Sequence, residues 1–132
     1  MNTINTLCIV DDDDIFQYLT KIIVEKTQLV QGIKIFSNGK EAIDFFYSVQ
    51  NHPEKIPEVI LLDLNMPILD GWGFLEEFIR LKPKLGKKVT IYIVSSSINP
   101  LDIEKAQSIG EVTDYIIKPI TQEKFMNMLK IL

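Results

Sequence analysis

Short apolar runs alternate with helical patterns along the chain, and this alternation limits the fold more than any other feature. The runs cover residues 7–10, 33–36, 58–62, 89–94 and 115–117. Short runs dominated by Ile, Val and Leu are typical of strands that are buried on both faces. Between the runs, apolar residues recur at every third or fourth position, which indicates amphipathic helices.

The helical patterns indicate which side of each helix should face the sheet. Asn38, Asn99 and Thr121 are suitable N-cap residues, and Pro100 suits the first helical position because it lacks a backbone N–H. The expected buried positions are Ile15, Phe16, Leu19, Ile22 and Ile23; Ala42, Ile43, Phe46 and Val49; Phe74, Leu75, Phe78, Ile79 and Leu81; Leu101, Ile103, Ala106 and Ile109; and Phe125, Met128, Leu129 and Leu132. Five strands alternating with five helices predict an α/β fold, a doubly wound parallel sheet, in a single domain spanning residues 1–132.

The composition is typical of a soluble globular protein. The 132 residues are 46% hydrophobic and 24% charged, and the net charge of −4 argues against sequence-independent nucleic-acid binding. No apolar run approaches the roughly 20 residues of a membrane helix, and the N-terminus lacks the pattern of a signal peptide. Cys8 is the only cysteine, which excludes an intrachain disulfide. We therefore expect a cytoplasmic protein with no direct nucleic-acid or membrane partner.

Polar side chains follow four of the apolar runs. Four aspartates, residues 11–14, end the first run, and Asp63 ends the third, while Ser95 and Lys118 follow the fourth and fifth. Because the carboxyl ends of parallel strands meet at one edge of the sheet, where ligands bind in such folds, we expect these groups to converge. The last two aspartates, at positions 13 and 14, are expected to cap the helix that follows.

This set of side chains suits phosphoryl transfer. Hard carboxylate oxygens favour Mg²⁺, whereas zinc would want His or Cys. A bound metal would neutralise the charge on phosphoryl oxygens, Lys118 would supply a second positive charge and Ser95 a hydrogen bond. A carboxylate can then act as the nucleophile and carry an aspartyl phosphate.

At these positions the chain resembles the receiver domains of two-component response regulators, over essentially its full length. The matching segments are residues 9–13, 61–67, 70–71, 93–96 and 114–120. Each segment alone is a weak signal, whereas together, in order and at the ends of four strands, they are specific. The resemblance implies a flavodoxin-like sheet with strand order 2-1-3-4-5, in a stand-alone regulator similar to the chemotaxis regulators.

The resemblance also implies roles for individual residues. Asp63 would be the phosphoacceptor, receiving its phosphoryl group from a phosphohistidine on a sensor histidine kinase or a histidine phosphotransfer protein. Asp12 and Asp63 would bind Mg²⁺ through their side chains, and Asp11 would bind it directly or through a water. The backbone carbonyl of Asn65 would be a further metal ligand.

Ser95 and Lys118 would contact the phosphoryl group. Tyr115 would be an aromatic switch whose side-chain rotamer follows the position of Ser95. The peptide bond before Pro119 would be cis. The chain would then be a signalling module that catalyses its own phosphorylation and dephosphorylation, not a separate enzyme. No output domain follows in this sequence, so the output would reach a downstream protein through the face of the fourth helix, fifth strand and fifth helix. That face would include Leu101, Lys105, Tyr115, Gln122 and Lys130.

A phosphohydrolase of the haloacid dehalogenase type is the alternative, with Asp11 as its nucleophile. That family resembles the pattern Asp11-x-Asp13 and also uses a hydroxyl, a lysine and Mg²⁺. This chain has Ile15 where that family has Thr or Val, and Glu111 and Asp114 match its late acidic pair poorly. A receiver-like scaffold that never takes phosphate is a third possibility, against which the complete set of site residues argues.

Overall fold

The sheet has five parallel strands in the order β2-β1-β3-β4-β5, as predicted. The computed structural model describes residues 3–130. The strands are β1 (Ile4–Val10), β2 (Val30–Phe36), β3 (Val59–Leu62), β4 (Thr90–Ser95) and β5 (Val112–Ile117). β1, β2 and β5 begin earlier than their apolar runs. In β5 the added residues include exposed Thr113 and Asp114, which an edge strand tolerates and a hydropathy pattern does not reveal.

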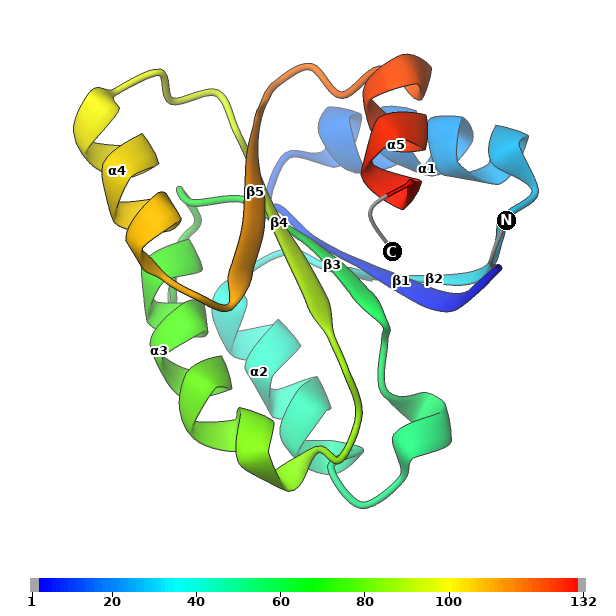
Figure 1. Cartoon of the computed structure of the whole chain (residues 1–132), viewed down its shortest axis with the longest axis vertical. Coiled ribbons are helices and arrows are strands. Elements are labelled where there is room, and N and C mark those ends of the chain that lie inside the picture. The colour runs from blue at the N-terminus through cyan, green and yellow to red at the C-terminus, as the bar shows by residue number, and fades with distance from the viewer. Residues whose placement is uncertain (1–2, 131–132) are drawn as a thin grey trace.

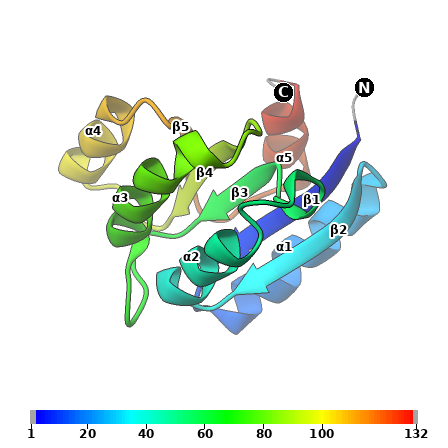
Figure 2. The ribbon, with the colours of Figure 1, turned by 90° about the horizontal axis from the view of Figure 1, so that it is seen from below.

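Helices cover both faces of the sheet. α1 (Asp14–Thr27) and α5 (Gln122–Leu129) lie on one face, and α2 (Gly39–Ser48), α3 (Gly71–Leu81) and α4 (Pro100–Ser108) lie on the other (Figures 1 and 2). Two short 3-10 helices, η1 (Pro53–Lys55) and η2 (Lys82–Lys84), lie in the connections before β3 and β4. Within the described part of the chain, no helix has both the length and the apolar character needed to cross a membrane.

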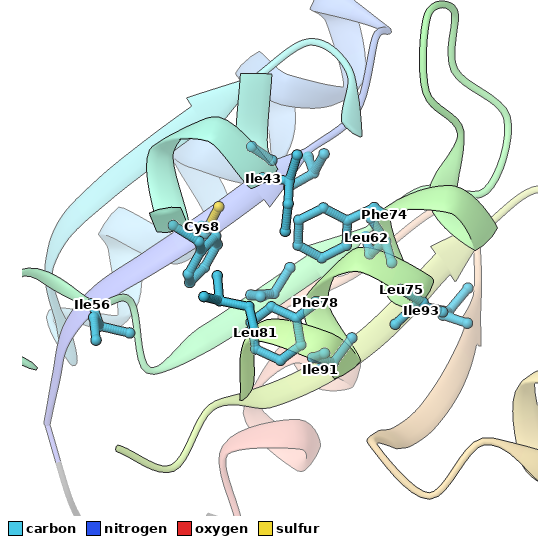
Figure 3. Packing of buried hydrophobic residues seen from close by; sticks show 14 of the residues in the cluster. Cys8, Ile43, Ile56, Leu62, Phe74, Leu75, Phe78, Leu81, Ile91 and Ile93 are labelled. Carbon is cyan, nitrogen blue, oxygen red and sulfur yellow. The ribbon is translucent and has the colours of Figure 1, made fainter. Parts of the chain in front are cut away.

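Two hydrophobic clusters, one on each face, hold the sheet between the helices. Alternate residues of β1 enter different clusters: Cys8 joins the cluster under α2 and α3, and Ile9 joins the cluster under α1 and α5. Phe74 and Phe78 of α3 stack at 5.7 Å between ring centroids in the first cluster, against the central strands (Figure 3). The central strands are therefore fixed on both faces, and their carboxyl ends are rigid positions for a site.

The predicted caps are confirmed. The side chain of Asn38 accepts a hydrogen bond from the N–H of Glu41, that of Asn99 from Leu101, and that of Thr121 from Lys124. In the aspartate run, Asp13 is the N-cap of α1 and Asp14 is its first residue.

The predicted buried face of α1 is partly wrong. Ile15 is 71% exposed and Leu19 is 52% exposed, whereas Thr20 and Val24 are the buried residues. Phe16 and Ile23 of the predicted stripe do pack against the cluster on this face, but the fully buried positions include a polar threonine, which a hydropathy pattern does not select.

Two further apolar positions face solvent, and one lies outside the described residues. In α4, Leu101 is 72% exposed because this helix packs mainly through the small side chain of Ala106. Ile79 of α3 is at the rim, 36% exposed. Leu132 lies outside the described residues.

Candidate functional site

The backbone hydrogen bonds of the sheet continue into the predicted site residues. Asp11 directly follows β1, Asp63 follows β3 and Lys118 follows β5. The N–H of Asp63 donates to the carbonyl of Val10 at 2.9 Å, and the N–H of Lys118 donates to the carbonyl of Ser95 at 2.9 Å. The ladder therefore holds these residues at one edge of the sheet, as the sequence predicts.

Three carboxylates form the centre of this edge. Asp11, Asp12 and Asp63 each place a carboxylate oxygen within 4.8 Å of the others. Asp11 is 1% exposed and Asp63 is 6% exposed, while Asp12 is exposed at the mouth. Oδ1 of Asp11 accepts a hydrogen bond from the N–H of Asp13 at 2.9 Å, and Oδ1 of Asp63 accepts one from the N–H of Leu64 at 2.9 Å.

Burial and mutual repulsion make this cluster electrostatically unfavourable on its own. Burial raises the pKa of Asp63 to about 6, the Asp11 carboxylate adds to the rise, and Lys118 opposes it. Burial likewise raises the pKa of Asp11, and the interaction with Lys118 opposes this rise. A single lysine therefore leaves the negative charge of three carboxylates incompletely balanced.

The donor set fits a hard divalent cation. The cluster consists of carboxylate oxygens, and the exposed position of Asp12 leaves a side open for water ligands. Burial is the larger cause of the two raised pKa values and repulsion adds to it, and a cation bound here would offset both. Mg²⁺, which keeps several waters and binds through few carboxylates, suits such a site.

Lys118 lies closer to one of the two buried carboxylates than to the other. Its Nζ lies 2.9 Å from Oδ2 of Asp11 and 3.7 Å from Oδ1 of Asp63, and its side chain is 18% exposed. The ammonium therefore makes its short contact with Asp11 and lies just beyond hydrogen-bond distance of Asp63. The peptide bond between Lys118 and Pro119 is cis, as predicted.

The structure links Ser95 and Tyr115 through a residue between them. Ser95 is fully buried, and its Oγ accepts a hydrogen bond from the N–H of Ser97 at 3.1 Å. The hydroxyl of Tyr115 donates to the carbonyl of Ser97 at 2.8 Å. Asn65 is exposed, two residues beyond Asp63.

Sequence reasoning missed several features around the site. Phe16, predicted as core, is half-buried and its ring centroid lies 4.3 Å from Nζ of Lys118. Ser97 donates a hydrogen bond from its Oγ to Asp102 at 2.7 Å. Ile68 has a φ of 69° and is 81% exposed. Pro67 indicates a turn there, but no turn rule selects a β-branched residue for a positive φ.

Comparisons with known proteins agree with this geometry. Residues 7–130 match the sequence model of the response regulator receiver domain. The chain is 26% identical over 117 residues to the probable methanogenesis regulatory protein FilR2 of Methanothrix harundinacea, an alignment that covers 89% of this chain and 74% of that protein.

Two further relatives differ in how much of their length is shared. A protein-glutamate methylesterase/protein-glutamine glutaminase of Methanococcoides burtonii is 32% identical over 113 residues, which cover 84% of this chain but 29% of that protein. The crystal structure of a two-component response regulator from Cytophaga hutchinsonii has a TM-score of 0.88 and 29% identity, covering 98% of this chain and 96% of that one. This chain belongs to the response regulator receiver domains of two-component signalling.

Proposed function

We propose that this receiver takes a phosphoryl group onto Asp63 from a phosphohistidine of a sensor histidine kinase or a histidine phosphotransfer protein. The observation that supports this most directly is the gathering of three carboxylates within 4.8 Å of one another, next to the ammonium of Lys118. In the transfer, a carboxylate oxygen of Asp63 attacks phosphorus, the P–N bond breaks, and its electron pair stays on the imidazole nitrogen. The same pocket later returns the phosphoryl group to water.

The site residues would have different roles in binding the metal and the phosphoryl group. Asp11, Asp12 and Asp63, with the backbone carbonyl of Asn65, would hold Mg²⁺. When bound, the metal supplies positive charge against the phosphoryl oxygens. Lys118 would supply a second positive charge to the phosphoryl oxygens. Ser95 donates its hydroxyl to a phosphoryl oxygen.

The two buried carboxylates are not equivalent, and the difference favours Asp63 over Asp11 as the acceptor. Oδ1 of Asp11 accepts a hydrogen bond from the N–H of Asp13, Oδ2 is held in an ion pair 2.9 Å from Nζ of Lys118, and Asp11 is 1% exposed. Oδ1 of Asp63 is held by the N–H of Leu64, and its Oδ2 accepts no hydrogen bond from residues 3–130. A free oxygen on a fixed carboxylate is what an in-line attack requires. This argues against the hydrolase alternative, whose nucleophile would be Asp11.

Phosphorylation would reach a partner-binding surface through Ser95. The Ser95 hydroxyl would donate to a phosphoryl oxygen on Asp63, and this would shift the Oγ that accepts from the N–H of Ser97, whose carbonyl also accepts from the hydroxyl of Tyr115. The face of α4, β5 and α5 would then change for a downstream protein. Leu101, Lys105, Gln122 and Lys130 are exposed there and available for contact.

Labelling with a small phosphodonor tests the proposal. Incubation with acetyl phosphate and Mg²⁺ should add one phosphoryl group by intact mass, stable in acid and labile in base. Asp63→Asn should abolish it, and chelation of the metal should suppress it. Asp70→Asn is the matched control, since Asp70 caps α3 and asparagine caps equally well. Labelling that persists in Asp63→Asn and disappears in Asp11→Asn would favour the hydrolase instead.

A further inference from the structure

Four residues at the site form a closed ring of contacts. The N–H of Asp13 donates to Oδ1 of Asp11 at 2.9 Å, and the N–H of Phe16 donates to Oδ1 of Asp13 at 3.3 Å. The ring centroid of Phe16 lies 4.3 Å from Nζ of Lys118. Lys118 closes the ring by its 2.9 Å contact with Oδ2 of Asp11.

The ring of Phe16 lies against an ammonium that is largely withdrawn from water. The side chain of Lys118 is 18% exposed, so its charge has lost most of its hydration. The carboxylates of Asp11 and Asp63, at 2.9 and 3.7 Å, compensate part of this loss. The π-face of Phe16 supplies a further attractive contact that does not compete for the carboxylates, and such contacts strengthen when the cation is desolvated.

The position of the ring is fixed by the acidic run itself. Asp13 caps α1 by accepting from the N–H groups of both Ile15 and Phe16, which sets the first turn of the helix relative to β1. Ile15, in the same turn, is 71% exposed, so the turn as a whole is not buried as core. Phe16 packs only at the rim of the cluster under α1 and α5.

From this geometry we infer that Phe16 is a positioning residue for Lys118. Its ring holds the ammonium at the pocket, between Asp11 and Asp63, in the place where it meets the incoming phosphoryl group. Without the ring, the lysine chain gains access to solvent and spends less time at the site. The kinetic consequence rests on the proposed function, whereas the contact itself does not.

The contact can be tested without phosphorylation. A proton next to an aromatic face experiences a ring-current shift, so the ε-methylene protons of Lys118 should resonate upfield of those of an exposed lysine such as Lys130. Phe16→Leu, which keeps an apolar side chain of similar reach, should remove the upfield shift, and Phe16→Tyr should keep it. Unshifted ε protons in the wild-type protein would overturn the inference.

The kinetic arm is a double-mutant cycle with acetyl phosphate and Mg²⁺. Phe16→Leu should lower the second-order rate constant of Asp63 phosphorylation by roughly three- to tenfold. Phe16→Tyr, which keeps an aromatic ring, should leave this rate constant close to the wild-type value. In a Lys118→Met background, Phe16→Leu should have less than about a twofold effect. An equal decrease of the rate constant in both backgrounds would mean that Phe16 acts through packing and not through Lys118. A wild-type protein that takes no phosphoryl group would instead overturn the proposed function, and the role of Phe16 in it.

Discussion

The hydroxyl of Tyr115 and the backbone carbonyl of Ser97 form a hydrogen bond of 2.8 Å that joins β5 to the loop after β4. The N–H of the same Ser97 donates to Oγ of Ser95 at 3.1 Å. One residue therefore contacts both members of the predicted switch. A shift of the Ser95 hydroxyl toward a phosphoryl group would reach Tyr115 through a single loop residue.

Tyr115→Phe should destabilise the protein by about 1 kcal/mol, because it removes the donor of a part-buried hydrogen bond and leaves the ring in place. Urea denaturation measures the change. Tyr18→Phe is the control, since Tyr18 is 64% exposed and its hydroxyl can bond to water in either state. Equal midpoints for Tyr115→Phe and the wild-type protein would mean that the Ser97 contact contributes nothing to the resting state.

Asp63→Asn should stabilise the metal-free protein above neutral pH. The folded-state pKa of Asp63 is about 6, above its ordinary 3.8, so the native state binds more protons between these values and stability falls as pH rises through them. At about pH 8 the whole penalty is present, on the order of 3 kcal/mol, and asparagine avoids it. Denaturation with chelator at about pH 4 and about pH 8 measures the difference.

The sign of this pH dependence distinguishes the explanation from general effects. The advantage of Asp63→Asn should shrink toward acid pH, where the wild-type carboxyl is protonated. Asp70→Asn, at the exposed cap of α3, is the matched control for the change from carboxylate to amide. A constant gain at all pH values would point to packing, not to the buried charge.

Magnesium should stabilise the wild-type protein and do so less in Asp12→Asn. A ligand that binds only the folded state, at about 100 times its dissociation constant, adds about 2.7 kcal/mol to the free energy of unfolding. Asp12 is the exposed member of the cluster, so its loss weakens binding without disturbing the core. Asp14→Asn, in the same acidic run at the start of α1, should respond to Mg²⁺ like the wild-type protein.

The sequence was sufficient for features that local rules determine. β3 is buried throughout and Asn38 is a cap, because strand hydropathy and capping act within a few residues. The acidic cluster was predictable because parallel strands bring their carboxyl ends together. The contact of Phe16 with Lys118 was not, since it depends on how α1 is rotated against β5. The burial of Thr20 in α1 was not predictable for the same reason.

Ile68→Asn should raise the free energy of unfolding by about 1 kcal/mol, because a left-handed φ is unfavourable for a β-branched residue and tolerated by asparagine. The φ of Ile68 is 69°, in a tight turn where the N–H of Leu69 donates to the carbonyl of Pro67 at 2.7 Å. Its side chain is 81% exposed, so little burial is lost. Ile98→Asn is the control, at 74% exposure without a positive φ, and should be nearly neutral in urea denaturation.

Gly71 connects the loop that carries Asp63 to the start of α3. Its N–H donates to the carbonyl of Leu64 at 2.9 Å. A Cβ at this position would lie 2.4 Å from the carbonyl oxygen of Asp63 and 2.9 Å from Cα of Leu64. Both are backbone atoms, so an added methyl group displaces the backbone of the proposed acceptor.

Gly71→Ala should therefore destabilise the fold by roughly 1–3 kcal/mol, as overpacking does, and should also reduce the stabilisation by Mg²⁺ because the Asp63 carboxylate moves. Urea denaturation with and without Mg²⁺ measures both effects. Gly110→Ala is the matched control, since an added Cβ there meets no atom within 4 Å. Gly71→Ala with an unchanged response to Mg²⁺ would mean that the loop yields without moving the carboxylate, so that close packing at Gly71 serves the fold and not the site.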